Sequence, residues 1–228
     1  MTKGYGQFCP VAKAAELFCE RWNALLLREL GAGASHFSQI QRGVPLMSPS
    51  MLSRRLKELE REGVIERDGA TYRLTEAGRE FLPLVDALGV WGQRWTRRQL
   101  KEDEVDFRLL IWDMERTVKA DAFGPGRTVV QLEFADLPAG KSLWWFINEQ
   151  SAVQLCLEDP GYEVDLFLSI TVRDMIYVWR GDLGVERALD EERLEAHGAP
   201  RFREALRSWF NLSRLAEIPS ARRDPQPV

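Results

Sequence analysis

An α+β fold in two parts is predicted for this chain of 228 residues. Residues 10–95 show the order helix, helix, short helix, capped helix, hairpin and long helix, and residues 107–212 show a run of strands flanked by helices. Between them, the polar stretch RRQLKEDEVD at 97–106 is the best candidate for a domain boundary. The expected parts are a domain at 1–100, a domain at 101–218 and a disordered tail at 219–228.

Composition and charge narrow the class of protein. Hydrophobic residues at 45% and charged residues at 29% are typical of a folded chain. Because neither an apolar run of about 18 residues nor a signal-peptide core is seen, we expect a cytoplasmic protein without a membrane partner. The net charge of −4 divides into +4 for residues 1–100 and −8 for residues 101–228. The two halves are therefore expected to have different roles.

The first hundred residues have the outline of a winged helix-turn-helix domain. Helical spacing of apolar residues over 11–30 predicts two helices, or one helix bent near Trp22, and a brief helix follows at 36–45. In the stretch 47–63 (MSPSMLSRRLKELEREG), Ser48 is a good N-cap and Pro49 suits the first helical turn. Two β-prone pieces around Asp68-Gly69 then predict a tight hairpin. This order of elements is that of winged helix-turn-helix proteins, which bind nucleic acid.

The capped helix is predicted to have two faces. At about 100° per residue, Leu52, Leu56 and Leu59 fall together, and Ser50, Arg54, Lys57 and Arg61 fall on the opposite side. If this helix enters a major groove, Ser50 and Arg54 face base edges and Lys57 and Arg61 lean toward phosphates. The alternative is a solvated face with an ion pair four residues apart, such as Arg54 with Glu58.

The second half is predicted to combine a sheet with several helices. Strands are expected at 127–137, 141–150, 151–159 and 162–170, and helices at 107–118, 171–181, 183–192 and 199–212.

Five blocks in the first half resemble the HxlR family of bacterial winged-helix transcriptional regulators. They occur in the family's order and cover about residues 8–98: CPVA (9–12), WNALLLREL (22–30), FSQI (37–40), SPSMLSRRLKEL (48–59) and YRLTEAG (72–78). The resemblance implies sequence-specific binding of double-stranded DNA as a homodimer, with repression as the family expectation. The hairpin turns back sooner than in many relatives, a departure that concerns minor-groove contact by the wing and not the recognition helix. The candidate DNA-binding residues are Ser38, Gln39, Ser48, Ser50, Ser53, Arg54, Arg55, Lys57, Arg61, Arg67 and Arg73.

The helix expected over 75–100 carries apolar residues along one side, including Trp91 and Trp95. The resemblance implies that this helix and the N-terminal segment form the dimer surface, and a two-fold dimer would match a palindromic operator. The alternative is that the two tryptophans pack on the second domain.

The cysteines and histidines are too few and too scattered for a disulfide framework or a metal site. In several members of the HxlR family, a cysteine before Pro-Val responds to electrophiles or oxidants. The resemblance therefore makes Cys9 a candidate redox thiol, and the alternative is a packing role. Cys19 falls on an apolar helical face and is expected in the core. No cofactor is expected, and since no catalytic motif is recognised, neither is an enzyme.

Residues 105–218 resemble the sterol-carrier-type α+β domain. The matching pieces are WWF (144–146), VQLC (153–156), DPGYEVDL (159–166) and WRGD (179–182). The resemblance implies a pocket for a small lipophilic effector, with Asp165 and Arg173 as polar anchors or a structural pair. The alternatives are plain core residues and a ligand-free dimerisation or interaction module. The candidate lining residues are Trp144, Phe146, Phe167, Ile176, Trp179 and Phe210.

Overall fold

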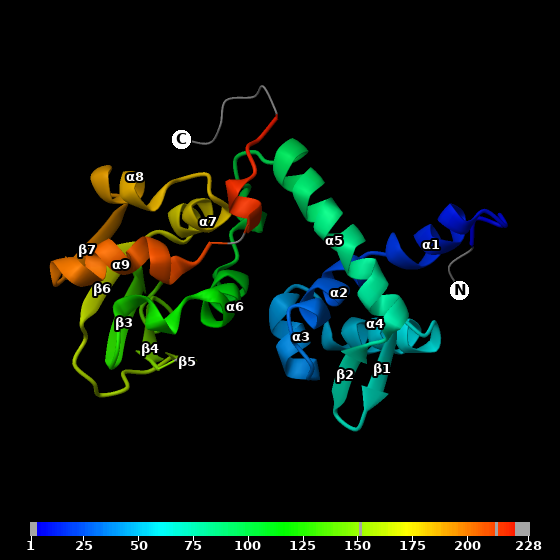
Figure 1. Ribbon diagram of the computed structural model, residues 1–228, viewed down its shortest axis with the longest axis horizontal. Coiled ribbons are helices and arrows are strands. Elements are labelled where there is room, and N and C mark those ends of the chain that lie inside the picture. Colours follow the sequence, from blue (N-terminus) through cyan, green and yellow to red (C-terminus); the bar gives the residue numbers. More distant parts are fainter. Residues whose placement is uncertain (1–3, 151, 213, 222–228) are drawn as a thin grey trace. The chain divides into compact units, whose positions relative to one another are not determined.

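The computed structural model describes residues 4–150, 152–212 and 214–221. The chain divides into two compact units, Met1–Gly89 and Val90–Val228 (Figure 1). The division lies within a long helix, ahead of the stretch 97–106 where the sequence suggested a boundary. From residue 222 onward, the expected tail lies outside the described residues.

The first unit has the predicted order of elements. Trp22 has a left-handed φ of 84°, so the first helical region is two helices and not one bent helix. The elements are α1 (Pro10–Phe18), α2 (Asn23–Gly31), α3 (Phe37–Gly43), α4 (Pro49–Arg61), β1 (Ile65–Asp68), β2 (Thr71–Leu74) and α5 (Glu76–Trp95).

Local signals in the sequence explain where these elements begin and end. The hydroxyl of Ser48 accepts a hydrogen bond from the Met51 amide at 3.3 Å and so caps α4. Asp68 pairs with Thr71 across the hairpin, which leaves Gly69 and Ala70 as a two-residue loop. Gly69 has a φ of +59°, the left-handed conformation that such short loops require.

The second unit contains a five-stranded sheet in the order β5-β4-β3-β6-β7. Strands β3 and β6 are parallel, and the other neighbours are antiparallel. The predicted strands and helices are confirmed, but β7 was not predicted. The elements are η1 (Glu102–Glu104), α6 (Phe107–Thr117), η2 (Ala120–Phe123), β3 (Arg127–Phe134), β4 (Leu143–Glu149), β5 (Ala152–Cys156), β6 (Leu166–Ile170), α7 (Val172–Arg180), α8 (Val185–Asp190), β7 (Leu194–Gly198), α9 (Pro200–Phe210) and η3 (Arg214–Glu217).

The core of this unit lies against one face of the sheet. Leu132, Phe146 and Leu168 from three neighbouring strands pack with residues of α6, α7 and α9. The buried Trp209 Nε1 donates to Asn148 Oδ1 at 2.7 Å, and Asn148 Nδ2 donates to two strand carbonyls. The polar groups of this asparagine are therefore satisfied inside the core.

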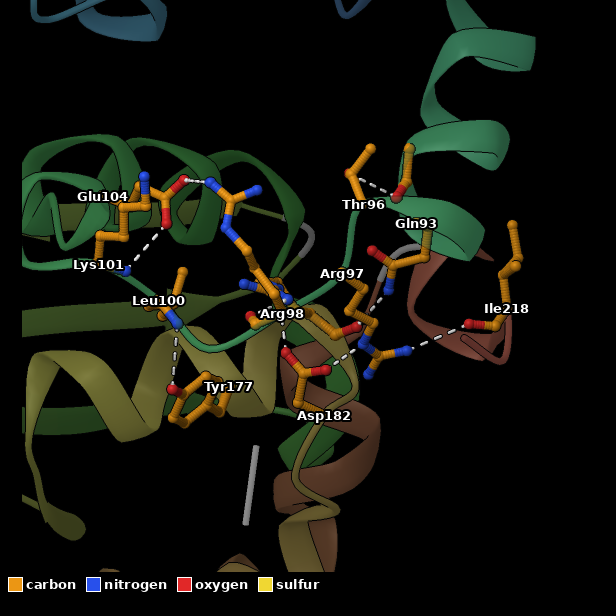
Figure 2. Close-up of polar contacts among 12 residues, drawn as sticks. Gln93, Thr96, Arg97, Arg98, Leu100, Lys101, Glu104, Tyr177, Asp182 and Ile218 are labelled. Carbon is orange, nitrogen blue, oxygen red and sulfur yellow. Dashed lines mark hydrogen bonds and ion pairs between the residues drawn. The ribbon is translucent and has the colours of Figure 1, made fainter. Parts of the chain in front are cut away.

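The end of α5 is fixed to the second unit by polar contacts (Figure 2). Arg97 pairs with Asp182, and their side chains are only 5% and 1% exposed. Gln93 Nε2 donates to the Arg180 carbonyl at 2.8 Å, and the Leu100 amide donates to the Tyr177 hydroxyl at 3.3 Å. The last turn of α5 thus belongs to the second unit, which explains why the division precedes the polar stretch.

Candidate nucleic-acid interface

Side-chain contacts hold α3 to the turn that precedes α4 and to α2. Gln41 Nε2 donates to the Met47 carbonyl at 2.7 Å, and an Arg28 guanidinium nitrogen donates to the Gly43 carbonyl at 3.0 Å. A Cβ at Gly43 would lie 2.0 Å from the carboxyl carbon of the buried Glu29. Any larger residue there would displace this carboxylate of α2, so glycine allows the close approach of α2 and α3.

Helix α4 has the two faces that its sequence predicts. Leu52, Leu56 and Leu59 are buried in the core of the first unit. The opposite side is exposed to solvent and carries Ser50, Arg54, Lys57 and Arg61.

The basic groups on this face differ in their pairing. Glu58 pairs with Arg55 at 2.6 Å, so the ion pair between Arg54 and Glu58 that a solvated face would use does not form. Among the described residues, the side chains of Arg54 and Lys57 have no ion-pair or hydrogen-bond partner. Arg61 is also exposed, but it pairs with the adjacent Glu62 at 2.9 Å. Arg54 and Lys57 therefore present two uncompensated positive charges.

The structure removes Arg55 from the candidate DNA-binding residues. Its side chain is only 12% exposed and pairs with Glu20 at 2.5 Å as well as with Glu58. Burial disfavours the charged guanidinium, but the hydrogen bonds and charges of Glu58 and Glu20 outweigh this effect, and the pKa of Arg55 is raised. Arg55 joins the region after α1 to the back of α4.

Several other candidates cap helices. Ser48 caps α4, and Gln39 Oε1 accepts hydrogen bonds from the Ser35 and His36 amides at the start of α3. Ser38 is exposed beside them, and Ser53 is half-buried.

The wing candidates have partners within the hairpin. Arg73 pairs with Asp68 at 2.6 Å, and Arg67 Nε donates to the Gly69 carbonyl at 2.9 Å. Both side chains are exposed. The Tyr72 amide donates to the Ser35 carbonyl at 2.7 Å, which ties the wing to the start of α3.

The six candidate effector residues do not lie together. Trp144, Phe146, Ile176, Trp179 and Phe210 all belong to or border the core of the second unit. Phe146 and Phe210 are fully buried against Trp209. Phe167 follows the core residue Leu166 on β6, so its side chain lies on the opposite face of the sheet, where it is 45% exposed. Phe167 cannot line a pocket with Phe146, and that part of the prediction is wrong.

The two suggested polar anchors have separate structural roles. Asp165 Oδ2 accepts a hydrogen bond from the Val129 amide at 2.9 Å. Arg173 donates to the Leu100 carbonyl at 2.6 Å and pairs with Glu102. They do not pair with each other in the described part of the chain.

The first unit matches known transcriptional regulators in sequence. The model of the HxlR-like helix-turn-helix family matches residues 17–100. The HTH-type transcriptional regulator YvaP of Bacillus subtilis is 36% identical over 97 residues, which are 39% of this chain and 90% of YvaP. The chain belongs to the HxlR-like helix-turn-helix family. It is a transcriptional regulator with a helix-turn-helix domain.

Other known proteins are each similar to a part of the chain. YodB of Bacillus subtilis, another HTH-type regulator, is 32% identical over 95 residues, 38% of this chain and 85% of YodB. Its quinone-bound crystal structure covers 37% of this chain and 96% of its own, with a TM-score of 0.35. Sterol Carrier Protein 2 Like 2 from Aedes aegypti is 20% identical, covers 45% of this chain and 97% of its own, and has a TM-score of 0.34.

The cysteines of the HxlR-like chain are free thiols. Cys9 is half-buried at the N-cap of α1. Cys19 was expected in the core, but it is exposed, because α1 ends at Phe18 and leaves Cys19 at the C-cap. Within the described residues, no group of three His, Cys, Asp or Glu side chains is placed to hold a metal ion. No helix in the same part of the chain has the length and apolarity to span a membrane.

Two cavities lie outside the expected effector region, and none of the six candidates lines either of them. One, of about 490 Å³, is in the first unit, and its lining includes Cys19, Asn23 and Arg55. The other, of about 280 Å³, lies beside the end of α5, with Arg98 and Arg180 in its lining. No pattern in the sequence indicates the first cavity, because residues from the N-terminal segment, α1, α2 and α4 meet there only in the fold.

Proposed function

We propose that the chain represses transcription by placing α4 in the major groove of double-stranded DNA. The observation that carries this proposal is the pair of exposed basic side chains, Arg54 and Lys57, which have no partner among the described residues. Ser50 and Arg54 face base edges near the start of the helix, and Lys57 and Arg61 approach phosphates. Arg61 must leave Glu62 to do so. Ser38 and the wing residues Arg67 and Arg73 lie on neighbouring elements and make secondary contacts.

The proposed active form is a homodimer on a palindromic operator. Phe8 and Val11, at the start of the chain, are 99% and 76% exposed. Along α5, exposed apolar side chains recur at intervals of four, three and four residues, a spacing that forms one stripe on a helix: Leu84, Leu88, Trp91 and Trp95. A second copy would cover this apolar surface, and a two-fold dimer presents two α4 helices to two half-sites.

Dimerisation is tested by sedimentation. Leu88→Glu places a charge in the middle of the stripe and is expected to shift the protein from twice the chain mass toward the single-chain mass. Glu80→Lys, on an exposed site of the same helix, is the control. An unchanged mass for Leu88→Glu would exclude this stripe as the interface.

For the second unit we propose a regulatory role with a small apolar effector. The half-buried side chains of Trp144, Ile176 and Trp179 border the core and are the remaining candidates for contact with it. A ligand that prefers one arrangement of the protein would change its DNA affinity. The alternative is an interaction module without a ligand, which a thermal-shift screen with lipophilic compounds would favour if no compound raises the unfolding temperature.

A redox function through Cys9 is the second candidate. It is favoured by the position of this free thiol at the start of α1, between the exposed Phe8 and Val11 of the proposed dimer surface. Oxidation there would alter the proposed interface. If Cys9→Ser protein loses DNA binding on oxidant treatment as the wild type does, Cys9 is not the sensor.

The DNA proposal is tested by gel shift with the DNA upstream of the chain's own gene. Arg54→Ala is expected to weaken binding by about tenfold to a hundredfold, which corresponds to one lost base contact. The matched control is Arg203→Ala, because Arg203 is exposed on α9 and its removal changes the net charge equally. Equal effects of the two substitutions would mean that only overall charge matters.

A further inference from the structure

The cavity of about 280 Å³ beside the end of α5 is lined by more positive than negative side chains. Among the described residues that line it, three are arginines (Arg97, Arg98 and Arg180) and one is acidic (Glu104). All of them belong to the second unit. Since residues 101–228 carry a net charge of −8, the excess of positive charge at this cavity is local.

A buried carboxylate compensates for part of this charge. Asp182 is 1% exposed and does not line the cavity, but it pairs with both Arg97 and Arg180. The Arg180 Nε lies 3.0 Å from Asp182 Oδ2. One carboxylate is thus shared by two guanidinium groups, which leaves one positive charge of this trio uncompensated.

Glu104 places a carboxylate of the chain itself among these cations. Its Oε1 accepts a hydrogen bond from Arg98 Nη2 at 3.1 Å, and its Oε2 accepts one from the Lys101 amide at 2.9 Å (Figure 2). The hydrogen bond from Lys101, together with the charges of Arg98, Lys101 and Arg180, outweighs burial and lowers the pKa of Glu104 below its ordinary value of 4.5. The side chains of Arg98 and Glu104 are 46% and 39% exposed, so a solute can reach both members of the pair.

The pair between Arg98 and Glu104 leaves donors unused. It occupies one guanidinium nitrogen of Arg98, and Nε and Nη1 have no partner in the described part of the chain. A guanidinium can bind a carboxylate through two parallel hydrogen bonds, which is stronger than a single bond. A free carboxylate can therefore bind Arg98 through more hydrogen bonds than Glu104 makes.

We propose that this cavity binds a small dicarboxylate, one carboxylate of which replaces Glu104 on Arg98 while the other binds Arg180. Once Glu104 has left, Arg97, Arg98 and Arg180 are opposed by Asp182 alone among these groups, and two negative charges neutralise the excess. The volume of about 280 Å³ lies just below the range of about 300–1,000 Å³ for small-molecule pockets, which favours a short compound such as succinate.

The consequence for DNA binding rests on the proposed function. Gln93 and Arg98 both bond to Arg180, so the last turn of α5 and the segment after it already contact the end of α7. A dicarboxylate adds a second link between Arg98 and Arg180. Trp91 and Trp95 of the proposed dimer surface lie in the same part of α5, and fixing this turn lowers the entropy lost on dimerisation. Succinate is therefore expected to strengthen operator binding several-fold in the wild type and to have no effect on it in Arg98→Gln protein.

The site itself is tested by calorimetric titration of the full chain with succinate, without DNA, near neutral pH and at constant ionic strength. Arg98→Gln is expected to weaken succinate binding at least about tenfold, because it removes the charged donor. The matched control is Arg94→Gln, which removes the same charge from an exposed position of α5 outside the cavity lining and should leave the affinity unchanged. Succinamide has the same carbon chain without charge and should not bind.

Replacement of the internal carboxylate gives a second readout with the opposite sign. Glu104→Gln removes the competing charge but keeps a side-chain oxygen for the Lys101 amide, so this variant is expected to bind succinate several-fold more tightly than the wild type. A merely structural role of Glu104 would not raise the affinity.

Three results would overturn the proposed site whether or not the chain binds DNA: no binding of succinate, equal affinities of the wild type and Arg98→Gln, or weaker binding by Glu104→Gln. Tighter binding of inorganic phosphate than of succinate would overturn the assignment of a dicarboxylate. Succinate binding as expected, with unchanged operator affinity, would retain the site and overturn its regulatory role.

Discussion

Adjacent arginines on α4 illustrate how the fold assigns different roles to the same side chain. The Arg54 side chain is exposed and has no partner in the described part of the chain, whereas the Arg55 side chain is only 12% exposed and pairs with Glu20 and Glu58. Successive helical residues differ by about 100° in direction, which separates solvent from the interior. The first arginine is available to a ligand, and the second stabilises the unit.

Replacing each arginine by methionine separates these roles. Arg55→Met leaves two carboxylates without their cation and is expected to lower the free energy of unfolding by about 2 kcal/mol. Arg54→Met should change stability by less than about 0.5 kcal/mol and should weaken DNA binding instead. Urea unfolding and a DNA titration of both variants check this. Comparable stability losses in the two variants would contradict the assignment.

Glu16 provides a pH-dependent contact at the residue scale. Its hydrogen bond from Lys13, and then that from the Tyr5 amide, hold its pKa below the ordinary value of 4.5. The pKa of Glu16 is lower in the folded protein than in the unfolded chain. Its contribution to the stability of the fold is therefore complete above pH 4.5 and is lost as the pH falls through the folded pKa. NMR titration of the carboxyl group should give a midpoint below 4.5, and Lys13→Met should raise it. A midpoint at or above 4.5 in the wild type would exclude the contact.

At the scale of elements, helix α5 contains glycines in opposite environments. A Cβ at Gly78 would lie 2.3 Å from the Val64 carbonyl oxygen, but at Gly92 the nearest atom, the Thr96 hydroxyl oxygen, is 3.7 Å away. Gly78→Ala is therefore expected to destabilise the protein by about 2 kcal/mol. Gly92→Ala should stabilise it by about 0.8 kcal/mol through helix propensity. Thermal unfolding of the two variants is the check, and a gain at both sites would contradict the close approach at Gly78.

The polar contacts drawn in Figure 2 hold the short segment after α5 in the second unit. Because the side chains of Arg97 and Asp182 are buried, Asp182→Asn is expected to lower the free energy of unfolding by about 3 kcal/mol. The control is Glu102→Gln. It removes the ion pair between Glu102 and Arg173, in which the Glu102 side chain is 93% exposed, and it should lower the free energy of unfolding by less than about 1 kcal/mol. If chemical denaturation shows equal costs, burial does not decide the strength of these pairs.

Elements with strong local signals were predictable from the sequence, and those that depend on distant contacts were not. Ser48, Pro49 and three spaced leucines are sufficient to predict α4. Strand β7 was missed because only Leu194 and Ala196 are buried in a five-residue segment, which is held by pairing with β6. That pairing joins residues far apart in the sequence.

The residues of the candidate site were likewise predictable where local spacing decides and unpredictable where distant contacts decide. Periodicity correctly placed Arg54 and Lys57 on the exposed face of α4. It could not exclude Arg55, because Glu20 lies 35 residues away. Similarly, the face on which Phe167 lies depends on the register between β3 and β6. Exposure can be inferred from helical spacing, but partners from other elements require the fold.

For the whole molecule, the charge asymmetry between the halves has a structural counterpart. The HxlR-like match, the helix-turn-helix and the unpaired basic residues all lie in the half with net charge +4. The half with net charge −8 contains the five-stranded sheet and is not suited to contact phosphates. DNA contact by the first unit and regulation by the second are a division of roles consistent with this distribution.

The most direct measurement is the salt dependence of DNA affinity for the wild type, Arg54→Ala and Lys57→Ala, by fluorescence anisotropy with operator and unrelated duplexes. Lys57→Ala should weaken binding to both duplexes and reduce the slope of log K against log salt by about one. Arg54→Ala should cost about 1–3 kcal/mol on the operator and little on the unrelated duplex. Unchanged affinity and slope in both variants would contradict the assignment of α4 as the DNA-binding helix.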